Sequence, residues 1–274
     1  MFFTELLKAF LYGVVEGITE WLPVSSTGHL ILLNRILPLQ VSADFSEMFD
    51  VVIQLGAILA VVVLYFRRLN PLSLSKSPLE RRETWGLWMR VLVAVIPSAV
   101  VGAVLDDWLD THLYNHLTVA VTLILYGVLF IVVEKRRSLR PAAVGNTVGF
   151  GEALSMGLFQ TLSLVPGTSR SGATILGGML MGLPRGTAAE FSFFMAIPTM
   201  LGAGLLKTIK LFSEGATVTP QEWQILAAGC LTAFLVSLCA IRFLTDFVKR
   251  HSFAPFGLYR IGLGILVLLL SRKG

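Results

Sequence analysis

The sequence predicts an all-α polytopic membrane protein made of two inverted repeats, each a re-entrant helical hairpin plus three transmembrane helices. Three observations predict this fold class. Hydrophobic residues make up 55% of the 274 residues and charged residues only 14%, against about 25% charged residues in a typical soluble domain. Six apolar runs approach or exceed the length of a membrane crossing. Two further apolar segments, one in each half of the chain, are interrupted by proline and glycine.

Charge and cysteine content narrow the classes of protein further. The chain has 22 Lys and Arg against 17 Asp and Glu, a formal net charge of +5, which in a membrane protein is interpreted as a loop bias. No basic patch interleaved with aromatic residues is present, so the expected partners are membrane lipids and not nucleic acid. Cys230 and Cys239 would lie about 13 Å apart along a helix, too far for a disulfide. The first residues lack a basic segment, so no removable signal peptide is expected.

Continuous apolar runs mark six expected crossings. At about 1.5 Å per residue, most of them can span a hydrocarbon core of about 30 Å, and the shorter ones need their flanking residues. The runs are Phe49–Phe66, Trp88–Leu105, Leu117–Val133, Phe191–Leu206, Trp223–Ile241 and Pro255–Leu270.

Two other segments are too long for one crossing and are broken in the middle. Leu6–Leu37 is interrupted at Pro23 and the following Ser-Ser-Thr-Gly run, and Phe150–Leu183 is interrupted at Pro166 and Gly167. Each segment suits two short helices that dip into the membrane and return to the same face. Irregular backbone at that depth is tolerated only where it is buried in protein or lines a wet cavity.

Basic and acidic segments alternate along the chain and set its orientation. Lys and Arg are enriched in cytoplasmic loops, so three basic segments are expected there and two acidic ones outside. The first hairpin then enters from outside and the second from inside. The basic loops carry Arg67, Arg68, Lys76, Arg81, Arg82 and Arg90, then Lys135, Arg136, Arg137 and Arg140, then Arg242, Lys249 and Arg250; the acidic segments carry Asp44, Glu47 and Asp50, and Asp106, Asp107 and Asp110.

A shift of 144 residues aligns the two halves of the chain. It pairs Gly13 with Gly157, Glu16 with Gln160, Ser25 with Ser169, Gly28 with Gly172 and Ile31 with Ile175. Together with the charge pattern, this predicts one membrane domain over residues 1–274, with repeat one at about 1–142 and repeat two at about 143–274. In such inverted repeats, broken helices meet near the middle of the bilayer.

The first break carries a pair of carboxylates. Glu16 and Glu20 are spaced i, i+4, so a helix places both on one face. Two carboxylates this close repel each other unless a cation lies between them, which suits a divalent metal, Mg²⁺ or Ca²⁺, or acid–base work. The competing interpretation is a solvated helix face at the membrane interface, which the cost of glutamate in lipid disfavours.

Hydroxyls and a histidine follow at residues 25–29. Ser25, Ser26, Thr27 and Gly28 are typical of a helix N-terminus, where free N–H groups favour an anion, and Ser25 is best placed as the cap. His29 lies three residues after Ser26 on the same face, so it could activate the Ser26 hydroxyl or protonate a leaving oxygen. A histidine that only satisfies its own hydrogen bonds is the less favoured alternative.

The second break carries an arginine between two serines. Arg170, with Ser169, Ser171 and Gly172 around it, offers a forked donor to phosphate oxygens in a tight turn. It could instead pair with Glu16 or Glu20. The two roles are compatible, because a substrate phosphate can displace such an ion pair.

These motifs closely resemble the bacterial undecaprenyl-pyrophosphate phosphatases of the bacitracin-resistance type. The resemblance covers essentially the whole chain and rests on EGITEWLPVSSTGH at 16–29, FDVVIQLG at 49–56, PGTSRSGAT at 166–174 and EFSF at 190–193. It implies hydrolysis of undecaprenyl diphosphate to undecaprenyl phosphate and inorganic phosphate. That reaction recycles the carrier lipid for peptidoglycan synthesis in the bacterial inner membrane and confers bacitracin resistance. The charge pattern predicts that the active site opens to the outer face.

Residues and resemblance fit one expected mechanism. Residues 25–28 and 169–172 cradle the diphosphate, Arg170 neutralises the transferred phosphoryl group, and Ser26 attacks with His29 as acid–base partner. Glu20, helped by Glu16, binds the metal or positions water. Direct attack by water stays open, as does a homodimer. Broken inverted repeats also occur in secondary transporters, so a lipid-phosphate flippase or small-anion carrier is the alternative function.

Overall fold

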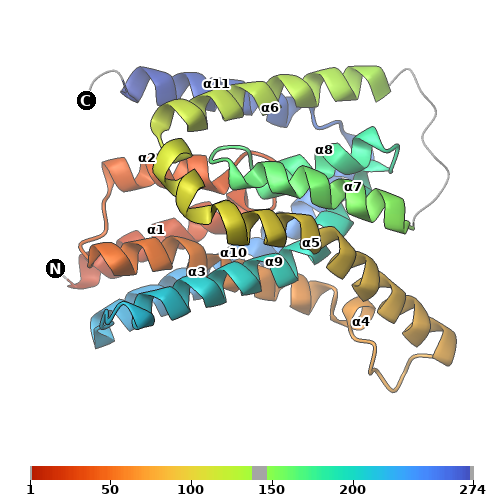
Figure 1. Cartoon of the computed structure of the whole chain (residues 1–274), viewed down its shortest axis with the longest axis horizontal. Coiled ribbons are helices and arrows are strands. Elements are labelled where there is room, and N and C mark those ends of the chain that lie inside the picture. The colour runs from red at the N-terminus through yellow and green to blue at the C-terminus, as the bar shows by residue number, and fades with distance from the viewer. Residues whose placement is uncertain (1, 138–146, 272–274) are drawn as a thin grey trace.

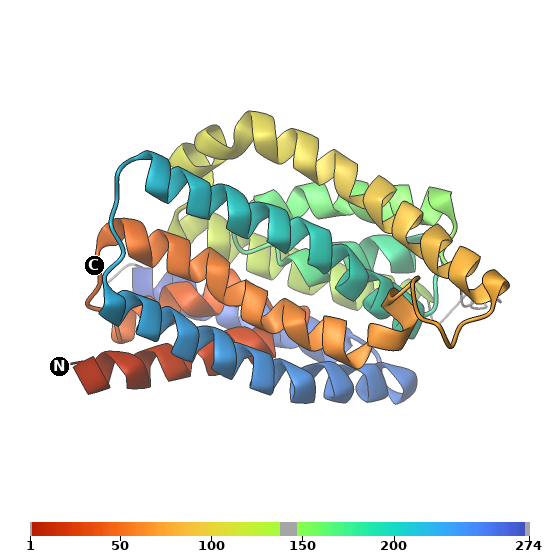
Figure 2. The same ribbon diagram turned by 90° about the horizontal axis from the view of Figure 1, so that it is seen from below.

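The computed structural model describes residues 2–137 and 147–271, and all regular secondary structure within these ranges is helical. Figures 1 and 2 show that the long helices run between the same two ends of the molecule. Arg140 and the predicted boundary between the repeats lie outside the described residues. So do the side chains of Asp106, Asp107, Asp110 and Arg137.

Six helices are long and apolar enough to cross a membrane within the described part of the chain. This confirms the six predicted crossings and the all-α polytopic membrane class. They are α3 (Ala43–Leu64), α5 (Pro78–Leu113), α6 (His116–Arg137), α9 (Arg185–Ser213), α10 (Pro220–Arg250) and α11 (Ala254–Ser271).

The crossing helices extend beyond their apolar runs, which corrects the predicted loops. Charged residues assigned to loops lie inside helices. α5 and α10 begin earlier than their apolar runs, at strong N-terminal signals, and α5, α6 and α10 also continue past the ends of their runs. Ser77 and Glu80 form a reciprocal capping box around Pro78, and Thr219 and Glu222 form another at α10. The residues now placed in helices are Arg67 and Arg68 in α4 (Phe66–Leu69), Arg81, Arg82, Arg90, Asp106, Asp107 and Asp110 in α5, Asp44, Glu47 and Asp50 in α3, Lys135, Arg136 and Arg137 in α6, and Arg242, Lys249 and Arg250 in α10.

Both predicted broken segments are helical hairpins. The first consists of α1 (Phe2–Thr19) and α2 (Ser26–Ile36). The second consists of α7 (Phe150–Thr161), a 3₁₀ turn η1 (Leu162–Leu164), and α8 (Arg170–Leu180). In Figure 1 the two hairpins begin at opposite ends of the molecule, and their breaks come together between those ends. The breaks predicted at Pro23 and at Pro166 are therefore confirmed.

Each hairpin packs against a long helix from the other half of the chain. α1 packs on α10 and α7 packs on α5, while α3 lies against α9 and α6 against α11. Close approach requires glycine, since a Cβ at Gly13 would lie 2.6 Å from the Gly229 carbonyl oxygen, and one at Gly157 would meet the Ala94 carbonyl. The 144-residue shift relates Gly13 to Gly157, although it does not relate their two contact partners. The division into repeats itself stays a prediction.

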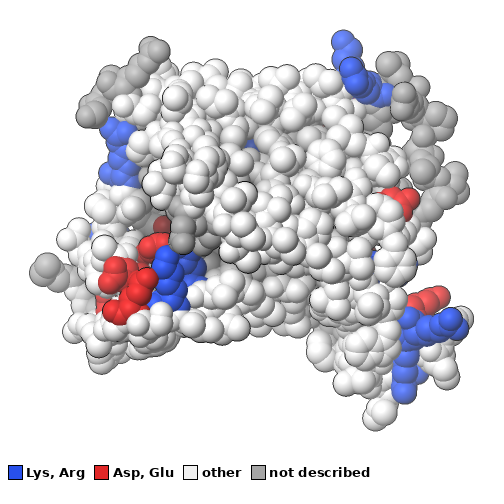
Figure 3. Space-filling model, viewed as in Figure 1, with Lys and Arg blue, Asp and Glu red and all other residues white. Residues whose placement is uncertain are grey.

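Charge is distributed as expected for a protein surrounded by lipid. In Figure 3 the Lys, Arg, Asp and Glu side chains gather at the two ends, and the band between them is almost entirely uncharged. Large apolar side chains of the crossing helices, such as Leu92 and Val100 of α5 and Leu235 of α10, are exposed. The rarity of charge in the band makes the buried ionisable groups at the hairpin breaks the natural place to look for function.

Candidate functional site

The two breaks have the same backbone design. Ser25 and Ser169 both adopt a positive φ, 74° and 72°, and they are the only such non-glycine residues in the described ranges. The Ser25 hydroxyl accepts the Gly28 N–H at 3.3 Å, and the Ser169 hydroxyl accepts the Gly172 N–H at 3.2 Å. The prediction that Ser25 caps a helix is confirmed. This backbone region costs a non-glycine residue about 1–3 kcal/mol and is concentrated at functional sites.

The same caps correct the predicted role of two glycines. Gly28 and Gly172 were expected to offer free N–H groups to a diphosphate, but both groups are already bound by the serine caps. The physical reason is that a capping serine satisfies the third N–H of its helix. The residues nearest the two helix starts are Ser26 and Thr27 in the first hairpin, and Arg170 and Ser171 in the second.

The centre of the site is a three-residue cluster that spans the two hairpins. The Ser26 hydroxyl donates to Glu20 Oε2 at 2.8 Å, and Arg170 Nη2 donates to Glu20 Oε1 at 2.9 Å. Glu20 and Ser26 are buried, and the side chain of Arg170 is 9% exposed. The structure thus brings together three of the four predicted catalytic residues.

Arg170 is held from three directions and keeps one donor free. Its Nη1 donates to the Ser192 carbonyl at 2.7 Å and to the Ser192 hydroxyl at 3.2 Å, and its guanidinium lies 5.8 Å from the Trp21 ring centroid. Its Nε is buried and has no hydrogen-bond acceptor among the described residues. A buried guanidinium with an unused donor is suited to an incoming anion.

Ser171 and Ser169 have structural partners. The Ser171 hydroxyl donates to the carbonyls of Glu20, at 3.0 Å, and of Leu22, at 3.3 Å. Ser171 therefore ties the second break to the first. The hydroxyl oxygens of Ser169 and Ser171 lie 3.3 Å apart. Thr27 is half-buried, and its hydroxyl makes no hydrogen bond within the described chain.

His29 does not make the expected contact with Ser26. Its Nδ1 lies 2.7 Å from the Ser25 carbonyl and its Nε2 lies 2.7 Å from the Tyr259 hydroxyl, with the two rings stacked. The ring of a histidine in the first turn turns back to the carbonyl four residues earlier, which takes it away from Ser26. A carbonyl only accepts, so Nδ1 carries a proton. The predicted direct contact between Ser26 and His29 is therefore not formed, and the Ser26 hydroxyl binds Glu20 instead.

Glu16 is the most unusual group in the site. It is completely buried, and neither carboxylate oxygen has a hydrogen-bond partner in the described structure. A buried carboxylate without a partner is strongly unfavourable and calls for a proton or a cation. The two oxygens fit the hard-oxygen chemistry of Mg²⁺ or Ca²⁺. A group of three or more His, Cys, Asp or Glu side chains placed to hold a metal is not found among the described residues, so any ion here would take further ligands from phosphate and water.

Arg260 contacts both hairpin breaks and was missed by sequence reasoning. It lies in α11 and is fully buried. Its guanidinium donates to the carbonyls of Pro23 at 3.2 Å, Gly167 at 2.9 Å and Thr168 at 2.8 Å, so one side chain holds both breaks. A single arginine within the apolar run Pro255–Leu270 was a signal that could have found it. Tyr259 carried no comparable signal, whereas Ser192 lies within the EFSF run at 190–193 without having been singled out.

Comparison with known proteins places these motifs in one family. A family model described as “Bacitracin resistance protein BacA” matches residues 9–266. An “Undecaprenyl-diphosphatase” of Lactiplantibacillus plantarum is 54% identical over 96% of this chain and 97% of its own length. One from Limosilactobacillus fermentum is 55% identical over 96% of each chain. One from Enterococcus faecalis is 52% identical over 98% of each chain.

Proposed function

The chain belongs to the bacitracin resistance protein BacA family, and from this premise we propose that it is an undecaprenyl-diphosphatase. The reaction releases inorganic phosphate from undecaprenyl diphosphate and leaves undecaprenyl phosphate. The proposal is supported by the names of full-length relatives at 52–55% identity. The observation that carries it is the buried cluster in which one carboxylate, Glu20, binds both a serine hydroxyl and an arginine.

Ser26 is the proposed nucleophile and Glu20 its base. Glu20 Oε2 takes the hydroxyl proton as Ser26 Oγ bonds to the terminal phosphorus, and the bond from that phosphorus to the bridging oxygen breaks. Undecaprenyl phosphate leaves with the bridging oxygen. Water then cleaves the phosphoserine bond and releases inorganic phosphate. The hydrogen bond of 2.8 Å between Ser26 and Glu20 is the geometry that a nucleophile and its base require.

Arg170 is proposed to stabilise the charge on the transferred phosphoryl group. An arriving phosphate competes with Glu20 for the guanidinium, and breaking that ion pair frees the carboxylate to act as a base for Ser26. The unused Nε gives Arg170 a further donor for phosphate. Charge stabilisation of this kind is the main catalytic contribution in phosphoryl transfer. The helix starts at Ser26 and Arg170 add N–H groups and the positive ends of two helix dipoles.

His29 is proposed to supply the proton for the leaving group through Tyr259. In the imidazolium form of His29 both ring nitrogens carry a proton, so Nδ1 donates to the Ser25 carbonyl and Nε2 donates to the Tyr259 oxygen. The Tyr259 hydroxyl then gives its own hydrogen to the bridging oxygen and receives the Nε2 proton, which leaves a neutral ring with its proton on Nδ1. Tyr259 is partly exposed, so it lies between the buried cluster and the surroundings.

Glu16 and Glu20 are the residues that would hold Mg²⁺ or Ca²⁺. When bound, the ion would supply positive charge against the phosphate oxygens. The support is the buried Glu16 carboxylate with both oxygens unused. Glu16 lies near the end of α1, and Glu20 follows that helix directly, with its N–H bonded to the Glu16 carbonyl at 3.0 Å. An ionised Glu16 would therefore also raise the electrostatic cost of leaving Glu20 without Arg170.

The proposed setting is the bacterial inner membrane, with the site opening to the outer face. The basic segments gather at one end of the molecule and would face the cytoplasm. Release of undecaprenyl phosphate there would recycle the carrier lipid for peptidoglycan synthesis and confer bacitracin resistance. A homodimer is compatible with the large exposed apolar surface.

Lipid flipping or anion transport is the second candidate, because hairpins that enter from opposite ends are typical of secondary transporters. The two functions are separated by measuring phosphate release from undecaprenyl diphosphate by the purified chain in detergent, where no gradient exists. Turnover that disappears in Ser26→Ala supports the enzyme. A well-folded wild-type chain without turnover, with or without added Mg²⁺ or Ca²⁺, contradicts it. If water attacks directly, turnover is reduced but not lost in Ser26→Ala.

A further inference from the structure

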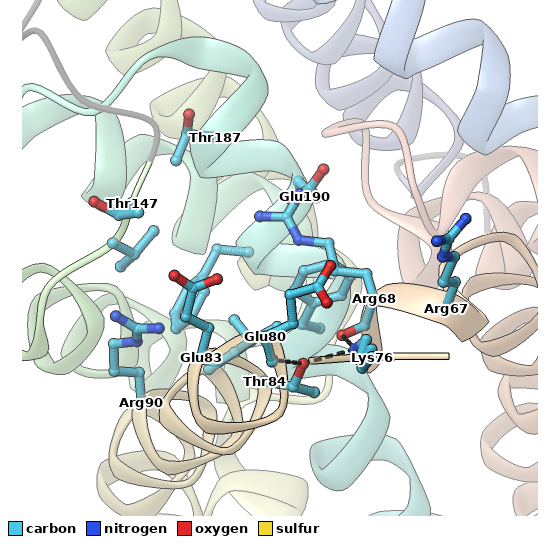
Figure 4. Close-up of a pocket in the computed structure, with 14 residues that line it drawn as sticks. Arg67, Arg68, Lys76, Glu80, Glu83, Thr84, Arg90, Thr147, Thr187 and Glu190 are labelled. Atoms are coloured by element: carbon cyan, nitrogen blue, oxygen red, sulfur yellow. Dashed lines mark hydrogen bonds and ion pairs between the residues drawn. The ribbon is translucent and has the colours of Figure 1, made fainter. Parts of the chain in front are cut away.

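A polar cavity lies away from the hairpin breaks. It has a volume of about 680 Å³ and is formed by the segment around α4, the first turns of α5 and α9, and residues 147 and 148. Figure 4 shows the charged side chains that line it. The candidate functional site contributes no residue to this lining. α9 separates the two, since Ser192 contacts Arg170 whereas Glu190 and Phe191 line the cavity.

The cavity has more unpaired cations than unpaired acids. Arg68 forms an ion pair with Glu190, and Glu80 is held by the backbone N–H of Ser77 at 2.7 Å. Besides the Arg68–Glu190 pair, the lining charges are the two carboxylates of Glu80 and Glu83 against three cations, Arg67, Lys76 and Arg90. None of these three forms a close ion pair within the described part of the chain, although Arg67 and Lys76 are near enough to Glu80 to interact with its charge. Lys76 donates instead to the Arg68 carbonyl and to the Thr84 hydroxyl.

Arg90 provides an independent sign of a missing ligand. Its Nε is buried and has no acceptor among the described residues. A buried donor without an acceptor costs about 1–3 kcal/mol, and native proteins leave few such groups unexplained. An anion in the cavity would supply the acceptor.

The cavity is polar at its rim and apolar at its base. Phe191 and Phe194 are buried beneath the charged residues, and the Arg68 guanidinium lies 5.6 Å from the Phe194 ring centroid. On the adjoining outer face of α5, Trp85 and Met89 are exposed. An anionic group attached to an apolar chain would match both surfaces. Basic pockets between crossing helices at the cytoplasmic side are typical sites for phosphate headgroups.

We propose that this cavity is a binding site for a phosphate monoester, on a lipid headgroup or as free phosphate, at the basic end of the molecule. Arg90 and Lys76 are its main ligands, and Arg67 lies at its rim. The site is independent of the hydrolytic reaction proposed above. A chain that fails to hydrolyse undecaprenyl diphosphate can therefore still bind phosphate here.

The test places a reporter inside the cavity. Thr187 lines it and is half-buried, so Thr187→Cys is made in the full chain after Cys230 and Cys239, both free, are replaced by alanine. The rate of maleimide labelling is measured in nanodiscs of phosphatidylcholine, of phosphatidylcholine mixed with phosphatidic acid, and of phosphatidylcholine with added inorganic phosphate. We expect slower labelling with phosphatidic acid, and free phosphate alone also protects if the lipid is not required.

Protection by free phosphate but not by phosphatidic acid assigns the site to soluble phosphate. Equal labelling under all three conditions overturns the proposal. Arg90→Gln should raise the phosphate or phosphatidic acid needed for half-protection by about tenfold or more. Arg82→Gln is the matched control, since it removes the same charge from an exposed position on the same helix that does not line the cavity. If Arg90→Gln does not fold, Lys76→Gln replaces it. Unchanged protection in a folded cavity variant also overturns the proposal.

Discussion

The two hairpin breaks have the same backbone conformation at their capping serines but contribute different polar side chains to the site. Both have a serine with positive φ whose hydroxyl caps the following helix. At the first helical position, however, the first hairpin has Ser26 and the second has Arg170, which are equivalent under the 144-residue shift. Both side chains bind Glu20, whose counterpart in the second hairpin is Leu164. The proposed nucleophile and base thus come from one hairpin and the cation from the other, so the cluster exists only where the two meet.

The two hairpins also differ one turn earlier in the chain, where the first has Glu16 and the second has its counterpart Gln160. Both are buried, with 0% and 1% exposure. The Gln160 amide donates to the hydroxyls of Ser98 at 2.6 Å and Thr199 at 3.1 Å. Glu16 has no such partners among the described residues. An amide that binds neighbouring hydroxyls stabilises packing, whereas a buried carboxylate without partners indicates a role that involves a cation or a proton.

The largest expected effect is the loss of turnover when Ser26, the proposed nucleophile of the first hairpin, is replaced. If Ser26 forms a phosphoserine with Glu20 as base, Ser26→Ala should lower kcat by at least about a thousandfold. Glu20→Gln and the double variant should then be similarly inactive, because the two residues act as one unit. Phosphate release in detergent measures each rate.

Ser163→Ala is the matched control for this comparison. Its hydroxyl donates to the Gln160 carbonyl in the second hairpin, and its loss should leave turnover near that of the wild type. A fall of only ten- to a hundredfold in Ser26→Ala would instead correspond to a lost phosphate contact of about 1.5–3 kcal/mol. That result would favour direct attack by water.

Arg260 joins the two breaks, so its removal should destabilise both. Arg260→Gln leaves buried carbonyls of Pro23, Gly167 and Thr168 short of donors. At about 1–3 kcal/mol for a buried group left unsatisfied, we expect a loss of about 3 kcal/mol in the free energy of unfolding. The midpoint of thermal unfolding in detergent measures it. Arg242→Gln, at an exposed position, should change the midpoint little, and equal midpoints for both variants would show that Arg260 does not hold the breaks.

The sequence was most informative about features that depend on local residues. Six apolar runs predicted the crossings, and Pro23 and Pro166 predicted the breaks, since apolar length and helix-breaking residues act where they stand. The Ser25 cap was predictable for the same reason. The contacts of Arg260 were not, because they join α11 to carbonyls more than 90 residues away. The predicted Ser26–His29 contact was wrong. Helical spacing places the two residues on one face, but it does not reveal that the Ser25 carbonyl and the Tyr259 hydroxyl bind the His29 ring instead.

Arg170→Lys tests whether the second hairpin contributes charge alone. Lysine keeps the charge but loses the planar fork that reaches Glu20 and Ser192 together. We expect kcat/KM for undecaprenyl diphosphate to fall by about a hundredfold, as for the loss of a strong charged hydrogen bond. Arg185→Lys is the control, because Arg185 pairs with Glu134 away from the breaks. Near-normal turnover in Arg170→Lys would make Arg170 a structural residue.

Glu16→Gln gives the first hairpin the residue that the second hairpin has at the equivalent position, Gln160. If Glu16 helps to hold a divalent ion, the Mg²⁺ concentration that restores half-maximal activity after chelation should rise by at least about tenfold. Gln160→Glu, the reverse change in the second hairpin, should not alter the metal requirement. Activity that is insensitive to chelation in the wild-type chain would instead assign Glu16 a role in proton transfer.

The smallest expected effects test whether the two serine caps are truly equivalent. Ser25→Ala and Ser169→Ala each remove the acceptor for a helix N–H and keep a Cβ at positive φ. Each should cost about 1 kcal/mol of unfolding free energy. Ser25→Gly and Ser169→Gly lose the same hydroxyl but relieve the backbone strain, so each should cost only a few tenths. Thermal midpoints in detergent should therefore rank wild type, glycine and alanine in that order at both positions. If only Ser25 follows this order, the cap at Ser169 does not hold its helix, and the two breaks share a shape without sharing its energetic basis.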